Sequence, residues 1–293
     1  MRRALAPTRG IASAPGLRPP PSRHRRASAL IALLLLALLA GACGQSEEEA
    51  PPRGPAAERH GERAVAALTR AEDVRARLVA ASDLYGLRAV EDARGHLAAA
   101  RATYAPLSPR AGARDRRLDV EISRAFSLVD ARMRRGASPA RVEEPINLLT
   151  GQLLDGALDL LLAPAARADP GVRAEALRRT SSALARRFAK GSGPGGGRGT
   201  RRARQHAYGL LARSQILARG LSGALGPERE PVVFALGSIR FEAYPLGLSP
   251  RPPTGAVVGD PPRVTPPPPP AARVAALTGA VRAALERRFA LGG

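Results

Sequence analysis

Apolar side chains recur every three or four positions through most of the chain after residue 58, and this is the spacing of amphipathic helices. The clearest stretch is 118–133, whose apolar face is followed by Gly136, a residue type that commonly ends helices. Ser138-Pro139 and Asp169-Pro170 each combine a capping residue with a proline suited to a first helical turn. The pattern predicts an all-α fold, an antiparallel helical bundle.

Further helices are expected at 58–107, 170–191, 201–219 and 271–291. The segment 146–163 is apolar nearly all round, so it is predicted to be the central helix of the bundle. The segment 229–245 is ambiguous. Its Val and Phe residues favour a strand, whereas the spacing of Val233, Leu236 and Arg240 favours a helix, which is the preferred interpretation.

The start of the chain has a different pattern. Seven arginines and no acid precede residue 43, and residues 27–42 are all apolar or small. Sixteen helical residues reach about 24 Å, which is less than the ~30 Å hydrocarbon core of a bilayer. Residues 1–42 are therefore predicted to be an export signal peptide.

This signal ends at Cys43, the only cysteine of the chain, in the run Leu39-Ala40-Gly41-Ala42-Cys43. The run resembles the lipobox of bacterial lipoproteins, although the usual leucine stands one position earlier, at Leu39. The resemblance implies cleavage after Ala42 and attachment of fatty acyl chains such as palmitate to Cys43. The alternative is an ordinary secretory signal with an incidental cysteine.

The remaining chain divides by composition. Residues 43–57 are expected to form the acylated cysteine and a flexible tether, and residues 58–190 the helical bundle. Residues 191–200 form a Gly-rich linker. Residues 201–293 form a C-terminal helical region, loosely ordered around the Pro-rich segment 245–270.

The 46 basic residues outnumber the 25 acidic ones, and a formal charge of about +14 remains after the seven arginines of the signal are removed. Such a surface favours anionic partners, here envelope polymers or lipids bound through Arg-rich faces such as Arg201, Arg202 and Arg204. No nucleic acid is expected, because aromatic residues make up only 3% and no recognition motif is present.

No sequence motif for an enzyme is present, so no catalytic residue, cofactor site or enzymatic activity is predicted. The weak metal candidates are Asp155 and Asp159, which share one helix face. Two close carboxylates repel unless a cation or arginines neutralise them, and pairing with arginine is the favoured interpretation. His96 is expected to be partly packed or exposed. Other acids are expected on solvated helix faces, namely Glu91, Asp92, Asp115, Asp119 and Glu121.

The run "GHLAAARATYAPLSPRAGARDRRLDVEI", residues 95–122, is similar to the helix-turn-helix of imelysin-like periplasmic proteins linked to iron uptake. The matching residues are Arg101, Tyr104, Pro109, Asp119 and Ile122. The family's acidic turn residue is replaced by Ser108, and its GxHxxE signature has Ile239 where the histidine belongs. The resemblance therefore implies an exported helical bundle rather than an iron site.

The sequence predicts a lipid-anchored, non-enzymatic binding or scaffold module of the cell envelope. It is expected in the cell membrane or the outer membrane, facing the extracytoplasmic side. The alternative is a helical ligand-binding component of a metal (iron) uptake system. The choice of membrane, the ligand and the oligomeric state stay open.

Overall fold

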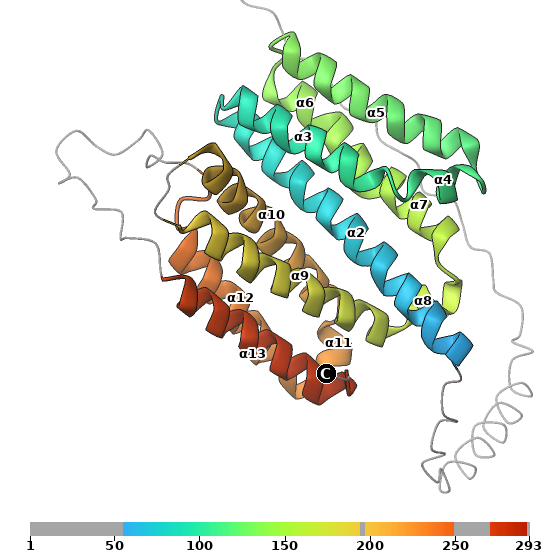
Figure 1. Ribbon diagram of the computed structural model, residues 1–293, viewed down its shortest axis with the longest axis vertical. Helices are drawn as coiled ribbons and strands as arrows, with labels where there is room; N and C mark the ends of the chain where they lie inside the picture. Colours follow the sequence, from blue (N-terminus) through green and yellow to red (C-terminus); the bar gives the residue numbers. More distant parts are fainter. Residues whose placement is uncertain (1–54, 194–196, 249–269, 292–293) are drawn as a thin grey trace, which may run out of the picture. The chain divides into compact units, whose positions relative to one another are not determined.

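The computed structural model describes residues 55–193, 197–248 and 270–291. Every regular element in these residues is a helix, and Figure 1 shows the long helices side by side, with their axes along nearly one direction. The chain runs along α2 (Pro55–Gly86) and returns along α3 (Val90–Tyr104). The prediction of an all-α fold is confirmed, and successive long helices run antiparallel.

The first group of helices surrounds one apolar cluster. After α3 come the short α4 (Ser108–Gly112) and the long α5 (Arg116–Arg134). α6 (Pro139–Leu148) continues through a π-helical turn (Leu149–Leu153) into α7 (Leu154–Leu161), and α8 (Pro164–Ala168) follows. Phe126, Leu78 and Leu149 are fully buried between these helices and one face of α2.

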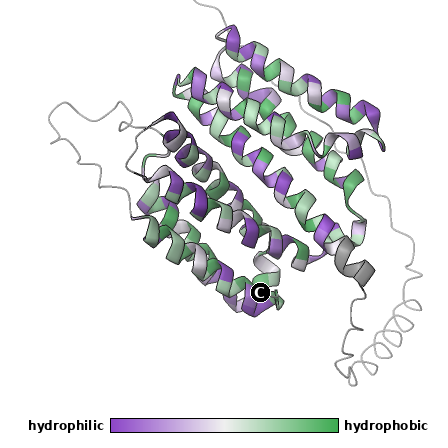
Figure 2. Cartoon of the chain, in the orientation of Figure 1, coloured by the Kyte–Doolittle hydropathy of each residue, from purple (hydrophilic) through white to green (hydrophobic). Residues whose placement is uncertain are grey.

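The second group surrounds a second apolar cluster. It comprises α9 (Pro170–Gly191), α10 (Arg198–Gly220), α11 (Ser222–Leu225), a 3₁₀ turn (Gly226–Glu228), α12 (Arg229–Ala243) and α13 (Ala271–Phe289). Its largest buried side chain is Phe188 of α9, which meets the ring of Tyr244 edge-on at 6.0 Å. Purple and green alternate along these helices in Figure 2, as expected of amphipathic helices.

The prediction that 146–163 forms the central helix is wrong. Leu148, Asp155 and Asp159 are exposed on that segment, so one of its faces meets solvent. The middle position belongs to α2, which contacts α3, α6, α7, α9 and α10. Every residue of α2 from Ala71 to Ala81 is buried or half-buried, although this stretch carries four charged side chains.

Those charges are neutralised inside the molecule. Glu72 accepts hydrogen bonds from Arg75 of its own helix and from Arg213 of α10, both at 2.6 Å. Arg75 also donates to Asp155 of α7 at 2.6 Å, and its Nε donates to the carbonyl of Thr150 at 2.8 Å. Because a buried charge requires partners, this cluster joins α2 to both groups of helices.

Irregularities in the 139–161 helix have local causes. Pro145 has no N–H to donate to the carbonyl of Arg141, four residues earlier, and the Arg132 side chain from α5 donates to that carbonyl instead. The π-helical turn includes Thr150, whose carbonyl accepts the hydrogen bond from Arg75. Contacts with neighbouring helices therefore satisfy backbone groups at both irregular positions.

Three sequence-based boundaries need correction. The expected helix 58–107 is two helices, because the chain turns at Leu87–Ala89, where Arg88 has a φ of +62°. Ser108 begins the short α4 rather than only breaking a helix. The segment 229–245 is helical, as preferred, but its buried face includes Val232 while Val233 is 50% exposed.

The helices on both sides of the glycine-rich segment pack against each other, since α9 contacts α10 along its length. α10 also packs on α2, and Arg53–Gly293 form one compact unit. The Pro-rich segment lies largely outside the described residues, but the helix expected at 271–291 is present as α13. Among the described residues, no helix has the length and apolar character needed to cross a membrane.

Candidate functional site

A cleft with a volume of about 550 Å³ opens between α2, α9 and α10, at the boundary between the two apolar clusters. Five of its lining side chains are cations and one, Asp73, is a carboxylate. The rest are threonines, small apolar residues, Leu210 and His206. The cleft is therefore polar and strongly cationic.

One face of α9 supplies most of the positive charge. Arg179, Ala183, Arg186, Arg187 and Lys190 follow one another at helical spacing, so they lie on the same side of the helix and line the cleft. Arg186, Arg187 and Lys190 make no ion pair or hydrogen bond with another described residue.

Arg70 of α2 adds a fourth cation opposite α9, also without a partner among the described residues. This side chain is exposed, as are Arg186 and Lys190, whereas Arg187 is half-buried. Four cations from two helices thus face one opening without counter-ions from the described part of the chain.

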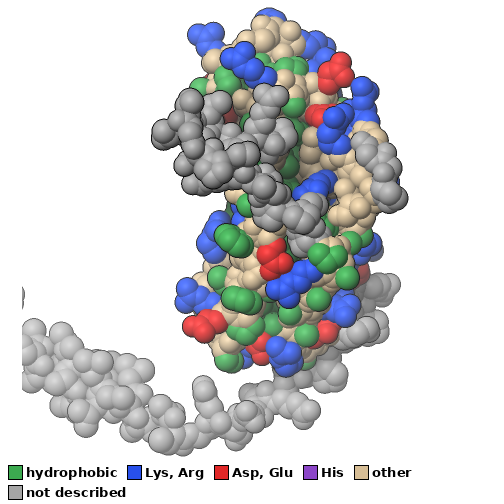
Figure 3. All heavy atoms as spheres, turned by 90° about the vertical axis from the view of Figure 1, so that its left-hand side faces the viewer, with side chains coloured by type: hydrophobic (Ala, Val, Ile, Leu, Met, Phe, Trp, Pro, Cys, Tyr) green, Lys and Arg blue, Asp and Glu red, His purple; other side chains and the backbone are tan. Residues whose placement is uncertain are grey.

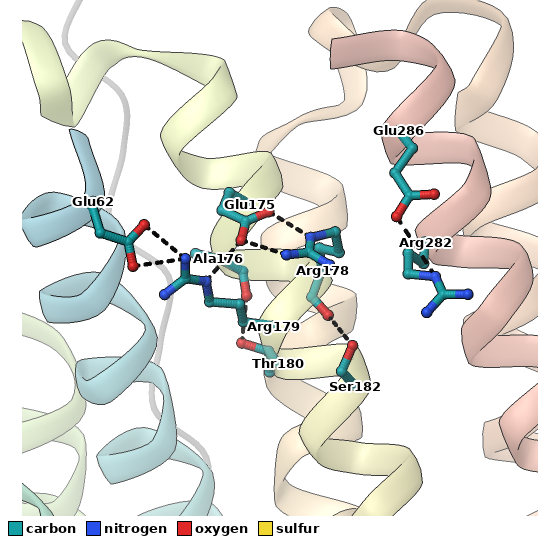
Figure 4. Close-up of polar contacts among 9 residues, drawn as sticks. All are labelled: Glu62, Glu175, Ala176, Arg178, Arg179, Thr180, Ser182, Arg282 and Glu286. Atoms are coloured by element: carbon teal, nitrogen blue, oxygen red, sulfur yellow. Dashed lines mark hydrogen bonds and ion pairs between the residues drawn. The ribbon is translucent and has the colours of Figure 1, made fainter. Parts of the chain in front are cut away.

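The fifth cation, Arg179, is already neutralised. Its guanidinium bridges Glu62 of α2, at 2.8 and 2.9 Å, and Glu175 of α9, at 2.7 Å (Figure 4). Burial opposes ionisation of Glu175, but hydrogen bonds from Arg178 and Arg179 outweigh it and lower the pKa of this carboxyl group. This ion-pair chain joins α2 to α9 at the rim of the cleft.

The floor of the cleft contains the opposite charge. The Oδ1 atom of Asp73 lies 2.5 Å from His206 Nε2 of α10. The Oδ2 atom accepts from Arg77 at 3.2 Å and lies 3.5 Å from the Thr103 hydroxyl of α3. Burial disfavours the charged form of Asp73, but its contacts with His206 and Arg77 outweigh this effect and hold its pKa at about 2. Asp73 is therefore ionised at neutral pH.

Hydroxyl groups complete the polar lining. Thr180 and Thr103 donate to carbonyls of their own helices, at 2.7 and 2.8 Å. The buried Oγ1 atom of Thr69 has no hydrogen-bond partner among the described residues. The four unpartnered cations can therefore hold an anion by charge-assisted hydrogen bonds.

Asp155 and Asp159, the metal candidates from the sequence, each form an ion pair with a different arginine. Asp155 pairs with Arg75, while Asp159 pairs with Arg167 of α8, and both carboxylates are about half exposed. In the part of the chain that the structure describes, no group of three or more His, Cys, Asp or Glu side chains is placed to hold a metal ion.

The arginines expected on a solvated face are only partly free. Arg201 pairs with Asp92 at 3.2 Å, while Arg202 lies against Gly95 of α3. The Arg204 guanidinium carbon lies 5.7 Å from the ring centroid of Phe188 and 5.9 Å from that of Tyr244. Arg201 and Arg204 also line a second cavity of about 940 Å³.

His96 is buried rather than partly packed or exposed, since only 3% of it is accessible. Its Nε2 atom lies 3.1 Å from Gln205 Oε1 of α10. Desolvation, together with the nearby cations, outweighs this hydrogen bond and lowers the pKa of His96 to about 4, so its ring is neutral at neutral pH.

Three acids expected on solvated faces have structural partners instead. Asp115 caps α5 by accepting from the backbone N–H of Leu118 at 3.0 Å. Asp119 accepts hydrogen bonds from Tyr104 at 3.0 Å and from Ser108 at 2.9 Å, and so joins α3, α4 and α5. The Asp92 carboxylate accepts from Gln205 at 3.1 Å.

Two sequence-based predictions remain, the lipidation site and the stretch similar to imelysin-like proteins. Cys43, the predicted lipidation site, lies outside the described residues. In the stretch similar to imelysin-like proteins, Ser108 and Tyr104 together bind Asp119. Ile239, which takes the place of the signature histidine, is fully buried in the second apolar cluster.

Sequence reasoning missed the cleft, although one signal was present. The spacing of Arg179, Arg186, Arg187 and Lys190 marks a cationic stripe on one helix face. It was indistinguishable from a solvated face because the opposing residues, Arg70 and His206, belong to distant segments.

Comparisons with models of protein families, with curated proteins and with solved structures find no match to this chain. The geometry of the cleft is therefore the observation from which a function can be argued.

Proposed function

We propose that this protein is a non-enzymatic binding module that holds an anionic ligand in the cleft between α2, α9 and α10. The observation that carries the proposal is the set of four cations without partners, Arg70, Arg186, Arg187 and Lys190, around that single opening. Arginine binds carboxylate and phosphate oxygens in a bidentate fashion, and lysine adds a compact point charge.

Among the described residues, these four cations differ from other unpaired arginines, such as Arg101 and Arg124, because they converge on one cleft. Elsewhere many arginines are paired, for example Arg273 with Glu242 at 3.0 Å and Arg287 with Glu228 at 2.8 Å. Figure 3 shows a face on which blue cationic side chains outnumber red acidic ones, with the two kinds interspersed. Like charges that converge on a concave site attract and concentrate anions.

We further propose that the module is exported and is held on the extracytoplasmic side of a membrane by lipid on Cys43. The support is the basic and then apolar leader that ends in the lipobox-like run before Cys43. Two or more acyl chains anchor a protein stably, because each buried CH₂ contributes about 0.8 kcal/mol. No observation in the described residues favours the metal-uptake alternative, since Asp155 and Asp159 are bound by arginines.

The anion site is tested by isothermal titration calorimetry on the mature chain with Cys43→Ser, using inorganic phosphate and then tripolyphosphate as probes. Replacement of Arg186 and Arg187 by Gln should weaken binding about tenfold or more, since each lost charge-assisted contact costs about 1.5–3 kcal/mol. The matched control replaces the exposed adjacent pair Arg116 and Arg117 of α5 by Gln and should change affinity less than about twofold.

Either of two results would contradict the anion site: no heat with either probe at low salt, or equal weakening by the two double variants. Added salt should weaken the wild-type interaction, because exposed charges are screened over about 8–10 Å at physiological ionic strength.

The anchor is tested separately in bacterial cells that express the full chain. Intact-mass measurement of the membrane fraction should find acyl chains on Cys43 and a chain that begins there. The Cys43→Ser variant should leave the membrane fraction. An unmodified cysteine in a membrane-free protein would refute the anchor without affecting the cleft.

A further inference from the structure

The cleft has two ends of opposite character, and this division restricts the ligand beyond its being an anion. Arg70, Arg186 and Lys190 are exposed and Arg187 is half-buried, while the ionised carboxylate of Asp73 lies at the floor. The Asp73 side chain keeps 28% of its surface accessible although it contacts three other side chains. A ligand that occupies the whole cleft meets both groups.

The carboxylate of Asp73 has room for one more donor. A carboxylate offers about four lone-pair sites, two on each oxygen. Oδ2 is used by Arg77 and Thr103, whereas Oδ1 contacts only His206. A ligand hydroxyl or ammonium group can therefore donate to Oδ1 without displacing a side chain of the protein.

The size and lining of the cleft exclude other forms of ligand. Its volume of about 550 Å³ exceeds what a bare phosphate or sulfate ion occupies, because a water molecule takes only about 30 Å³. Among the described lining residues there is no Phe, Tyr or Trp, and the His206 ring is buried, so no exposed ring is available on which a nucleobase could stack. The apolar part of the lining consists of small or aliphatic residues, Ala66, Ala183 and Leu210, which suit a short aliphatic chain.

The number of unpartnered cations favours a doubly charged group. A phosphate monoester carries about −1.5 to −2 at neutral pH and has three strong acceptor oxygens. A single planar carboxylate or a phosphodiester carries one charge and would leave most of the four cations without a counter-ion.

Building on the proposed function, we infer that the ligand is a phosphate monoester of a short aliphatic polyol or amino alcohol. Its phosphate binds Arg186, Arg187, Lys190 and Arg70, and its hydroxyl or ammonium group donates to Asp73. A phosphate monoester with a free hydroxyl occurs both in soluble esters and in lysophosphatidic acid, a lipid. Cys43 lies 12 residues before the start of α2, at most about 40 Å of extended chain, so the cleft is within reach of a bilayer surface.

The test compares three probes by calorimetry with the mature Cys43→Ser chain: ethyl phosphate, O-phosphoethanolamine and glycerol 3-phosphate. All three carry the same monoester, but only the last two carry a donor that reaches Asp73. At least one of the two should bind about tenfold more tightly than ethyl phosphate, the gain of one charge-assisted hydrogen bond.

The variant Asp73→Asn should remove this preference. It should reduce the advantage of the donor-bearing probes to less than about twofold, while ethyl phosphate binds as tightly as before or more tightly, because a nearby negative charge is gone. The matched control is Asp130→Asn on α5, where the carboxylate also bridges two basic side chains and has a similar exposure of 31%. This control should leave all three affinities unchanged.

The outcomes separate this inference from the proposed function. If no probe binds, the anion site itself is refuted. If all three bind equally in the wild type, the anion site stands and the inference is overturned, whether or not Asp73→Asn folds. Competition by vesicles that carry lysophosphatidic acid, a phosphate monoester with a free hydroxyl, against glycerol 3-phosphate would identify a lipid headgroup as the source, and binding of soluble esters without competition would identify a free metabolite.

Discussion

The two faces of α2 hold the molecule together by different means. The face toward α3, α6 and α7 is apolar apart from Arg75, and it packs Val74, Leu78 and Ala81 into the first cluster. The face toward α10 contains Glu72, Asp73 and Ala76, which meet Arg213, His206 and Gly209. We call this second contact the polar seam.

The difference shows at which positions substitutions are tolerated least. On the apolar face, side chains of similar volume can replace one another at modest cost. In the polar seam each partner is specified by charge or by the absence of a side chain. The cleft opens at this seam, since Asp73, His206 and Leu210 line it. The following predictions test the contrast, beginning with the largest expected effect.

Replacement of Glu72 by Gln should reduce the free energy of unfolding by about 3–5 kcal/mol, because Arg75 and Arg213 lose their shared buried counter-ion. Urea denaturation followed by circular dichroism measures the change. The control is Glu121→Gln, which breaks the exposed pair with Arg117 on α5 and should cost less than about 0.5 kcal/mol. Equal effects from the two variants would mean that the seam charges contribute no more than surface charges.

Acid should first weaken the contact between α3 and α10, which lies beside the polar seam. His96 has a pKa of about 4 in the fold against 6.5 in the unfolded chain, so the unfolded chain binds the proton first. The neutral ring is favourable above pH 6.5, and as the pH falls from 6.5 to 4 stability should decrease by up to about 3 kcal/mol. Denaturation curves in this range should lose most of that slope in the variant His96→Asn.

Asp73 titrates in a separate window. Its folded pKa of about 2 lies below the unfolded value of 3.8, so its contribution is complete above pH 3.8 and is lost as the pH falls towards 2. A stability loss confined to this lower window, with no slope between pH 6.5 and 4, would contradict the assignment of the upper window to His96.

Replacement of Gly209 by Ala should cost about 1–3 kcal/mol, because the new Cβ would lie 2.0 Å from the carbonyl oxygen of Ala76 and the two helices would have to separate. Gly237→Ala provides the control. This glycine lies inside α12 with open space around it, so alanine should stabilise the protein by up to about 1 kcal/mol. Melting temperatures should move in opposite directions; a shift of the same sign would show that α10 does not need close approach at this position.

Loss of the Asp115 cap should have the smallest effect. Asp115→Ala removes the acceptor for the N–H of Leu118 at the start of α5 and should cost about 1 kcal/mol. Asp115→Asn retains an acceptor and should cost less than half as much. An unchanged melting temperature in Asp115→Ala would show that this cap does not contribute to the stability of the protein.

Local patterns in the sequence were sufficient to predict the buried face of helices whose polar face is exposed to solvent. The stripe Ile122, Phe126, Val129 and Met133 predicted the buried face of α5, and Val274, Val281 and Leu285 did the same for α13. Hydrophobic periodicity within one helix needs no information about its neighbours, so it can be read directly.

The same rule failed for α2 and for 146–163 because burial does not follow hydropathy when charges have internal partners. Glu72 and Arg75 look like solvent-facing residues, yet they are almost fully buried. Leu148 looks buried, yet it is 42% exposed. The cleft was not predicted for a related reason. In the sequence its cations look like a solvated helix face, because the sequence does not show which helix lies opposite them.

By itself, the sequence determined the helical class and the Asp169 cap, and it predicts a leader that ends at Cys43, because each depends on residues only a few positions apart. Only the tertiary structure decided that α2 is central and that a cationic cleft exists. The partners involved, such as Glu72 and Arg213, are 141 positions apart, and a helical pattern carries no information about which distant helix supplies a counter-ion.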